Sequence, residues 1–323
     1  NYIDYKGFFK RREASQERGF LRGIGFGCFL ETSRGSPVEG AEIRFAESGS
    51  IELRVGTESN GQGHETTYID LVSERLGVEA DLFDYIQANT FEVRLGSGHG
   101  GARSMHMGVA TMILAVEEVI GKAKGVAAVL LQAEIDELSF KNGSFTSGSG
   151  NRSVTLKEVA IAARDNRIAP HLEGMGLDTF TKREHAPFTF PNGCHAAEVE
   201  IDPETGSVTL IKYIMVDDYG SLVNPVLTEG QLHGGVAQGI GQALMEFVSF
   251  DENTGQLLSG SLMDYTLPRA AMLPNFEATL EGAPTKANVL GVKGVGQAGC
   301  IAAPQTIVHA VLNALSPLKI IHL

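Results

Sequence analysis

The chain has 323 residues, of which 43% are apolar and 20% charged, and its formal net charge is −13. This length exceeds what one hydrophobic core usually serves, so two domains or subdomains of a folded globular protein are expected. The acidic balance argues against a nucleic-acid partner, because phosphate binding needs a basic surface. The one basic cluster, residues 10–12, is expected to face solvent.

No stretch approaches the roughly 18 apolar residues of a membrane span, and the N-terminus lacks a signal-peptide pattern. The cysteines Cys28, Cys194 and Cys300 are odd in number and widely spaced, without a C-x-x-C motif. This spacing argues against a disulfide framework and against an iron–sulfur or zinc site. A reducing, cytoplasmic compartment is therefore expected.

The first half of the chain alternates strand-like and helix-like segments. The stretches AEIRFAE (41–47) and SIELRVGT (50–57) predict strands. The period then changes in GQGHETTYIDLVSERLG, whose apolar residues from Tyr68 to Leu76 share one helical face and which Gly77 ends. The small-residue loop GSGHGGARS leads into an apolar helix over about 105–120, and TLKEVAIAARD predicts a short helix.

The second half begins after a stretch without clear periodicity. Residues 166–193, rich in proline and glycine, are expected to connect a first subdomain, 1–165, to a second, 194–323. HAAEVEIDPETGSVTLIKYIMVDD predicts a hairpin that turns at DPETG. NPVLTEGQLHGGVAQGIGQALMEFV predicts a glycine-rich helix, DENTG a second hairpin, and APQTIVHAVLNALSP a last helix with Pro304 in its first turn.

The segment GVKGVGQAGC (291–300) contains a G-x-G-x-x-G spacing at Gly294, Gly296 and Gly299. A dinucleotide-binding turn needs a strand before it and an acidic residue about 20 positions later. Here VLGV is a doubtful strand and PLKIIHL supplies no acid. The dinucleotide hypothesis is therefore disfavoured, and a close-approach loop before a helix remains.

Three glutamines stand beside glycines, and each is expected near a helix start: Gln62, Gln231 and Gln297. A primary amide has two donors and one acceptor, so it can pair with a heterocyclic edge that presents both kinds of group. The alternative is that each glutamine caps its helix or faces solvent.

The motifs NGQGHETTYIDLVSERLGV, GHGGARSM, SLVNPVLTEGQLHGGVAQGIGQALME, GSLMDYTLP and GVKGVGQAG, in this order, resemble the C-terminal molybdenum-cofactor-binding half of the xanthine dehydrogenase and aldehyde oxidase family. The resemblance covers nearly the whole chain. It implies an α+β fold of two α/β subdomains with mixed sheets and packed helices, and the cofactor bound between them. It also implies a molybdenum hydroxylase, in which the metal is held by a pyranopterin dithiolene and a glutamate serves as base.

Carried onto this sequence, the resemblance assigns Gln62, Gly63 and Gln231 to binding of the pterin or its pyrophosphate region. It assigns the loop Gly101, Ala102, Arg103 and Ser104 to the neighbourhood of the metal, where Arg103 is expected to bind a phosphate or a neighbouring carboxylate, the alternative being a surface arginine. It also implies that no protein side chain ligates the metal directly. The histidines His64, His99, His106 and His233 are accordingly expected in packing or loop hydrogen bonds.

The resemblance places Gly296 and Gln297 on the active-site loop, where Gln297 occupies the position of the family's catalytic glutamate. An amide does not titrate near neutral pH, so Gln297 cannot act as that base. Three explanations stay open: an engineered substitution, a natural paralogue with altered chemistry, and a subunit that binds cofactor without ordinary hydroxylation. Glu65 is a weak candidate for a replacement base.

The chain lacks the F-G-G motif of the family's other half, the iron–sulfur cysteines and a flavin domain. It therefore looks like one part of a split molybdenum subunit or a fragment of a longer one. The expected cofactor is the cytosine dinucleotide form, and the expected partners are the other half of the subunit, a [2Fe–2S] subunit and an FAD subunit, with a small-molecule substrate. The alternative function is a catalytically silent relative that stores, inserts or senses the cofactor.

Overall fold

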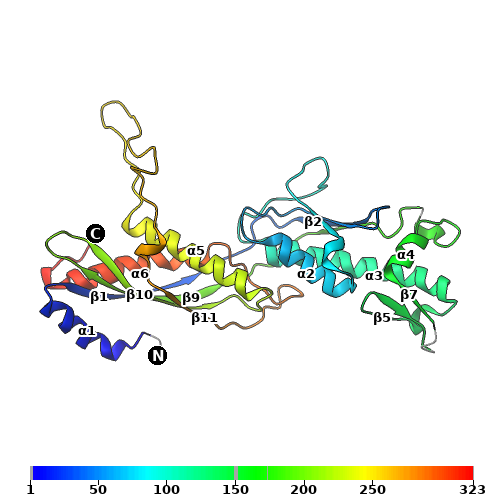
Figure 1. The fold of residues 1–323 in the computed structure, drawn as a ribbon, viewed down its shortest axis with the longest axis horizontal. Coiled ribbons are helices and arrows are strands. Elements are labelled where there is room, and N and C mark those ends of the chain that lie inside the picture. The colour runs from blue at the N-terminus through cyan, green and yellow to red at the C-terminus, as the bar shows by residue number, and fades with distance from the viewer. Residues whose placement is uncertain (1–2, 149–151, 173, 323) are drawn as a thin grey trace. The chain divides into compact units, whose positions relative to one another are not determined.

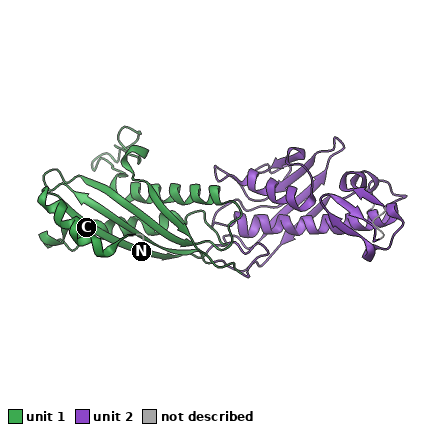
Figure 2. Ribbon diagram, turned by 60° about the horizontal axis from the view of Figure 1, so that its bottom comes forward, with its two compact units in different colours: residues 1–32, 190–285, 293–323 green, residues 33–189, 286–292 purple. Residues whose placement is uncertain are grey.

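The computed structural model describes residues 3–148, 152–172 and 174–322 and divides the chain into two compact units (Figure 2). Unit 1 comprises residues 1–32, 190–285 and 293–323, and unit 2 comprises residues 33–189 and 286–292. This division differs from the sequential one expected, because the first 32 residues belong with the C-terminal part. Pairing between distant strands decides this, and local periodicity does not reveal such pairing.

Unit 1 is built on a four-stranded sheet in the order β1-β9-β10-β11 (Figure 1). Strand β1 (Leu21–Leu30) runs antiparallel to β9 (Asn192–Ile201) along its whole length. Strand β10 (Val208–Asp218) is antiparallel to β9, which confirms the hairpin predicted at DPETG, and β11 (Phe276–Leu280) is parallel to β10.

Two helices of unit 1 pack together on one face of this sheet. Helix α6 (Ala298–Leu315) lies against β1, where a Cβ at Gly23 would come within 2.0 Å of the Ala310 carbonyl oxygen. Helix α5 (Pro225–Leu244) packs on α6 in turn, and Gly299 brings the two backbones together. By length and composition the stretch 298–318 is apolar enough to span a membrane, although half of its most apolar part is buried inside unit 1.

Pro304 lies inside α6 rather than in its first turn, because the helix begins six residues earlier than expected, at Ala298. The earlier turns are buried against α5, and this packing outweighs the loss of one backbone donor. The second predicted hairpin consists of a single bridge, Phe250 to Leu257. Figure 1 shows this segment projecting beyond the end of α5.

Helix α1 (Tyr5–Glu17) packs near β1, and its basic cluster is only partly solvated. Lys10 is exposed, but Arg11 is bonded to the buried Glu198, and Arg12 donates to the Arg22 carbonyl at 2.9 Å. The expectation of a solvent-facing cluster is therefore wrong for both arginines, because carboxylates and carbonyls contributed by distant segments bind them.

Unit 2 has a four-stranded sheet in the order β4-β3-β2-β8. The predicted strands are confirmed as β2 (Glu39–Phe45) and β3 (Ile51–Val55), which pair antiparallel. Strand β4 (Phe83–Ile86) is parallel to β3, and β8 (Thr179–Arg183) is antiparallel to β2. Each unit combines a sheet with packed helices, as the predicted α+β class requires.

Helix α3 (Ala110–Leu131) contacts β2 and β8 and is almost entirely apolar on its buried side. It starts later and ends later than predicted, and the preceding Ser104–Val109 forms a π-helical segment. Helix α2 (His64–Leu76) ends at Gly77 as predicted, with φ 63° at that glycine. Helix α4 (Leu156–Ala162) is also confirmed and begins with a capping box between Thr155 and Glu158.

The remaining elements are short. A small antiparallel sheet in unit 2 contains β5 (Ser139–Lys141), β6 (Ser144–Thr146) and β7 (Ser153–Thr155). The 3₁₀ turns are Ala80–Leu82, Ile135–Glu137, Pro170–Leu172, Ala270–Met272 and Ser316–Leu318.

Candidate functional site

The start of α2 in unit 2 carries the first predicted binding residues. Gly61 and Gly63 have φ angles of 119° and 72°, which glycine adopts without steric cost. A Cβ added at Gly61 would meet no described atom within 4 Å, so the backbone there borders open space. Gly63 is the N-cap of α2, and no described side chain caps its N–H groups. The helix start is therefore open to a polar or anionic ligand.

Gln62 shows how its amide is used at this helix start. Its side-chain oxygen accepts from the backbone N–H of Asn60 at 2.6 Å and from the Ser59 hydroxyl at 3.3 Å. Its amide nitrogen makes no hydrogen bond to any described residue. Local bonds thus orient the amide and leave both N–H donors for a ligand.

His64, the first residue of α2, is buried with 5% of its surface exposed. Burial, with a smaller effect of nearby His99, lowers the pKa of His64 to about 4, so its ring is neutral at pH 7. Nδ1 of His64 and Nδ1 of His99 are both buried and find no hydrogen-bond partner within the described chain.

Arg103 is fully buried, which excludes the surface-arginine alternative. Its Nη1 lies 2.6 Å from Glu39 Oε2 and donates to the Gly98 carbonyl at 3.0 Å. Its Nη2 donates to the carbonyls of Ser36 and Val38. The guanidinium is therefore engaged by a neighbouring carboxylate, one of the two options expected, and its bonds hold the loop in place.

The other residues of this loop have distinct surroundings. Gly101 has φ 89°, and a Cβ there would lie 2.5 Å from the Gly35 backbone, so this glycine permits close approach of two chain segments. Ala102 also has a positive φ of 53°. Ser104 is buried, and its carbonyl accepts from the Tyr68 hydroxyl at 2.8 Å.

Gln231 and Gln297 belong to unit 1, and their helix positions differ. Gln231 lies inside α5, well past its start at Pro225, so the expectation that it stands near a helix start is wrong. The helix begins earlier because the Asn224 side chain caps it at Leu227 and Pro225 suits its first turn, and Gly230 does not interrupt it. Gln297 is the N-cap of α6, as expected of a residue at a helix start.

The two glutamines of unit 1 stand on elements that touch. A Cβ at Gly299 would lie 2.4 Å from the Leu232 carbonyl oxygen, so α5 next to Gln231 meets α6 just after Gln297. Gln297 and Gly296 are exposed, and Gln297 makes no side-chain hydrogen bond to the described residues. Gly299 of the G-x-G-x-x-G spacing therefore serves helix packing.

The segment before Gln297 is anchored by residues that the sequence did not single out. The backbone N–H of Lys293 donates to the Tyr219 carbonyl at 2.9 Å, and its ammonium group binds Asp218 at the end of β10. The ammonium group also lowers the pKa of Asp218, against the effect of burial, which raises it. The adjacent acids in VDDYG were the available sequence signal.

Asp217, next to Asp218, belongs to a buried network in unit 1. Its Oδ2 accepts from the Tyr219 hydroxyl at 2.6 Å and lies 3.2 Å from His195 Nε2. His195 Nδ1 lies 2.7 Å from the Tyr213 hydroxyl. Burial raises the pKa of both tyrosines, so they remain neutral donors. This network supports the strands that carry the anchored segment.

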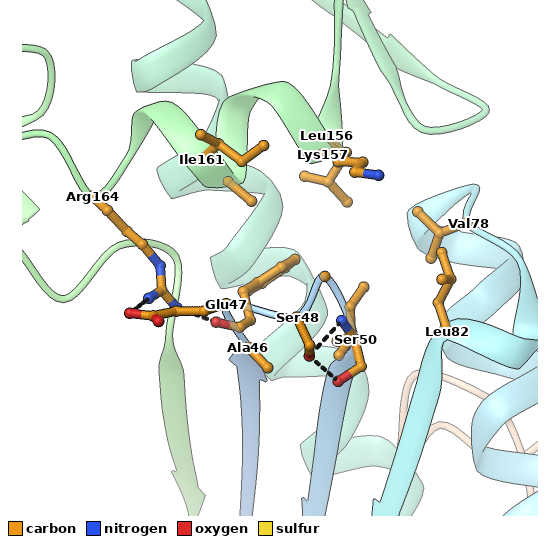
Figure 3. Close-up of a pocket in the computed structure, with 14 residues that line it drawn as sticks. Ala46, Glu47, Ser48, Ser50, Val78, Leu82, Leu156, Lys157, Ile161 and Arg164 are labelled. Carbon is orange, nitrogen blue, oxygen red and sulfur yellow. Dashed lines mark hydrogen bonds and ion pairs between the residues drawn. The ribbon is translucent and has the colours of Figure 1, made fainter.

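Unit 2 also contains a pocket of about 350 Å³ between the β2–β3 turn, the residues after α2, and α4 (Figure 3). Its floor is apolar, and the ion pair between Arg164 and Glu47 lies at its rim. None of the candidate cofactor residues lines it. The pocket is therefore separate from the candidate site.

Comparison with known proteins accounts for the arrangement of these motifs. Residues 1–274 match the model of the molybdopterin cofactor-binding domain family. The chain is 32% identical to the nicotine 6-hydroxylase large subunit of Paenarthrobacter nicotinovorans, covering 98% of this chain and 40% of the relative. It is 28% identical to a putative xanthine dehydrogenase molybdenum-binding subunit of Escherichia coli, covering 94% of this chain and 41% of the relative.

Among solved structures, the CO dehydrogenase of Oligotropha carboxidovorans is similar, with a TM-score of 0.87, 29% identity, and coverage of 98% of this chain and 41% of that one. The chain thus spans about two fifths of the length of the curated relatives it matches. The family match extends over most of the chain and includes the Gln62, Arg103 and Gln231 motifs. The chain therefore belongs to the molybdopterin cofactor-binding domain family, as a molybdenum-binding portion of the xanthine dehydrogenase and aldehyde oxidase group.

Proposed function

We propose that this chain supplies part of the molybdopterin site of a molybdenum hydroxylase that oxidises an aldehyde or N-heterocycle with water as oxygen source. The observation that carries the proposal is the start of α2, where the Gln62 amide nitrogen and the buried His64 Nδ1 have no partner among the described residues. Buried polar atoms normally find partners, so a ligand there would satisfy them.

The donor set at this helix start fits the proposed cofactor. The amide of Gln62 and the neutral ring of His64 suit the polar edge of a pterin, and the open N–H groups of α2 suit a phosphate. In unit 1 we assign Gln231 to cofactor binding, since its half-buried side chain makes no hydrogen bond to the described residues. When bound, the molybdenum cofactor would supply the two-electron redox chemistry.

Arg103 has a positioning role in this proposal. Its two Nη groups bond to Glu39 and to three carbonyls, and its buried Nε has no partner among the described residues. We therefore assign the Nη groups to holding the loop Gly101–Ser104. A loop fixed in this way keeps its backbone groups in one arrangement before a ligand arrives, which lowers the cost of ordering on binding.

Gln297 occupies the position that we assign to the catalytic base. Its side chain is exposed at the start of α6, as access to a substrate requires. An amide has no lone pair basic enough to take a proton at neutral pH, and loss of a general base costs about 10²- to 10⁴-fold in rate. We therefore expect slow turnover by this chain in its complex. The exposed Glu65 at the start of α2 does not replace the base in this proposal.

We further propose that the site is completed by other polypeptide segments. The similar proteins are large subunits or chains about two and a half times longer, so this chain corresponds to part of them. The segment after α5 also exposes apolar side chains that a partner would cover: Phe247, Phe250, Leu262 and Met263. The proposed partners are the other half of the molybdenum subunit, a [2Fe–2S] subunit and an FAD subunit, in the cytoplasm, with the cytosine dinucleotide cofactor.

Metal content tests the binding role. The complex isolated with its natural partners should contain molybdenum and release CMP on acid hydrolysis. Gln62→Leu and Gln231→Leu should each lower the molybdenum content, whereas the exposed Gln16→Leu in α1 should leave it unchanged. A complex without molybdenum, or equal content in all variants, would refute the proposal.

A catalytically silent role in storing, inserting or sensing the cofactor is the second candidate, and the amide of Gln297 favours it. Gln297→Glu separates the two functions. An enzyme that lacks only its base should gain about 10²-fold or more in oxidation of aldehydes or heterocycles, at unchanged molybdenum content. Gln305→Glu, an exposed site on the same helix, is the control. No gain would establish the silent role.

A further inference from the structure

Cys28 and Cys194, 166 positions apart in sequence, face each other across two strands of unit 1. They are directly opposite in the antiparallel pairing of β1 with β9, and their sulfur atoms lie 3.2 Å apart. Opposite residues of antiparallel strands have Cα atoms about 4.5–5.5 Å apart, within the range that a disulfide bridges. The two strands therefore already hold the two thiols within reach of one another.

Both cysteines are exposed, unlike their neighbours along β1. Gly27 and Phe29 are buried, whereas Phe26, Cys28 and Leu30 are exposed. The pair thus lies on the side of β1 that faces away from α6, where a small reagent can reach both sulfurs. Cys300, the third cysteine, lies on α6 and is only partly accessible.

The pair sits near the end of the ladder, at the point where both strands continue into unit 2. The regular ladder of β1 with β9 ends at Leu30 and Asn192, and hydrogen bonds between the two segments continue from Glu31 to Pro191 and between Ser33 and Thr189, where unit 2 begins. Strand β1 is the edge of the sheet and is held by a single neighbour, β9. A covalent link here would add to the backbone hydrogen bonds of β1 with β9 and to the ion pairs of Arg22 with Glu198 and Glu200 farther along the same two strands.

Burial and the adjacent Cys28 raise the pKa of the Cys194 thiol to about 11, so Cys194 is protonated at pH 7. A neutral thiol lies beside another sulfur without charge repulsion, which allows the close contact. Because the thiolate is the form that attacks a disulfide, Cys194 reacts slowly with a disulfide reagent at pH 7 and a long incubation is required.

We propose that Cys28 and Cys194 form a reversible cross-strand disulfide, a modification site that responds to low-molecular-weight disulfides. One cysteine thiolate attacks the reagent disulfide, giving a mixed disulfide and releasing one reagent thiol. The second cysteine, after losing its proton, attacks the mixed disulfide, forms the Cys28–Cys194 bond and releases the second reagent thiol. Two protein thiols are oxidised and one reagent disulfide is reduced to two thiols. In a reducing compartment such a bond would be transient.

The experiment uses the full-length polypeptide in complex with its natural partners and glutathione disulfide as the probe. Peptide mapping without reduction should find the Cys28 and Cys194 peptides joined, two hydrogens lighter than their sum, and separated again by dithiothreitol. Cys300→Ser should behave like the parent. Cys28→Ser should leave Cys194 unlinked or carrying glutathione. Because the readout is a peptide mass, it does not depend on cofactor or activity.

Three outcomes would overturn the proposal: unmodified thiols after prolonged incubation, separate glutathione adducts on Cys28 and Cys194 in the parent, or a link that includes Cys300. Hydrogen exchange provides a second measurement. The linked form should exchange the amides of β1 at least about tenfold more slowly than the reduced form, because the edge strand can no longer separate from β9. Equal exchange rates would refute the restraint on β1.

Discussion

Arg103 and Glu39 form an ion pair that water does not reach, with Nη1 and Oε2 2.6 Å apart and both side chains 0% exposed. Burial raises the pKa of the Glu39 carboxyl, and Arg103 and the Gly40 amide oppose that effect. The pair joins the first residue of β2 to the loop 98–104, whose other residues are His99 and small residues. Its removal should therefore affect both the stability of unit 2 and the shape of the candidate site.

Arg103→Met should lower the free energy of unfolding by about 3–5 kcal/mol, because Glu39 is left as an uncompensated buried charge. Urea unfolding followed by circular dichroism measures this, since the chain has no tryptophan for fluorescence. The matched control is Arg167→Met, which removes the exposed pair with Asp165 and should cost less than about 1 kcal/mol. An equal loss in free energy of unfolding in the two variants would contradict a larger stabilising contribution from the buried pair.

Stability should fall in acid because His64 and His106 are buried as neutral rings. Burial lowers the pKa of each from 6.5 to about 4, so the unfolded chain binds protons first as pH falls. Their stabilising contribution is fully present above pH 6.5 and is lost between 6.5 and 4, at up to about 3 kcal/mol each. His64→Gln should reduce the pH dependence of the free energy of unfolding over this interval, and the exposed His171→Gln should not. An unchanged slope in His64→Gln would show that this histidine is not buried neutral.

Two glycine substitutions in unit 1 should have opposite effects. A Cβ at Gly299 would lie 2.4 Å from the Leu232 carbonyl oxygen, so Gly299→Ala should destabilise by about 1–3 kcal/mol. A Cβ at Gly234 in α5 would meet no described atom within 4 Å, and Gly234→Ala should stabilise the helix by up to about 1 kcal/mol. Thermal unfolding of the two variants measures the difference. Similar shifts in both would mean that α5 and α6 do not touch at Gly299.

The Asp217 network gives a further prediction. Tyr219→Phe removes the 2.6 Å donor to Asp217 and leaves that buried carboxylate with His195 at 3.2 Å. The expected loss in free energy of unfolding is about 1.5–3 kcal/mol, as for a hydrogen bond to a charged group. Tyr265→Phe, which removes a hydroxyl bonded to Glu246 in a less buried position, should cost less in the same urea titration. A larger loss for Tyr265→Phe would contradict the burial of the network.

Local patterns predicted helices and turns well where a particular residue, such as glycine, favours a turn or a helix end. The apolar face from Tyr68 and the stop at Gly77 are confirmed in α2, and the turn at DPETG is confirmed between β9 and β10. Helix boundaries were less accurate when packing extended a helix beyond its strongest periodic stretch. Helix α6 begins at Ala298, since contact with α5 stabilises the turns before Pro304.

For the candidate site too, local motifs predicted some features and could not predict others. The motif order in the sequence identified the family, and the family match over residues 1–274 confirms it. The sequence could not show that Arg103 would form an ion pair with Glu39, 64 positions away, or that Cys28 would face Cys194. Such pairs depend on which strands and loops meet, and no periodicity within a short window encodes that choice.

The sequence by itself determined the chemistry available to this protein: amides beside glycines in three motifs, an amide at position 297, and most of the strands and helices that carry them. Only the tertiary structure decided how those groups are used, because burial and pairing arise from contacts between distant segments. Burial keeps the His64 ring neutral, and its Nδ1 has no partner among the described residues. The ion pair with Glu39 makes Arg103 a residue that holds its loop in place. Residues 21–30 joined the C-terminal unit for the same reason, since pairing with β9 satisfies the backbone of β1.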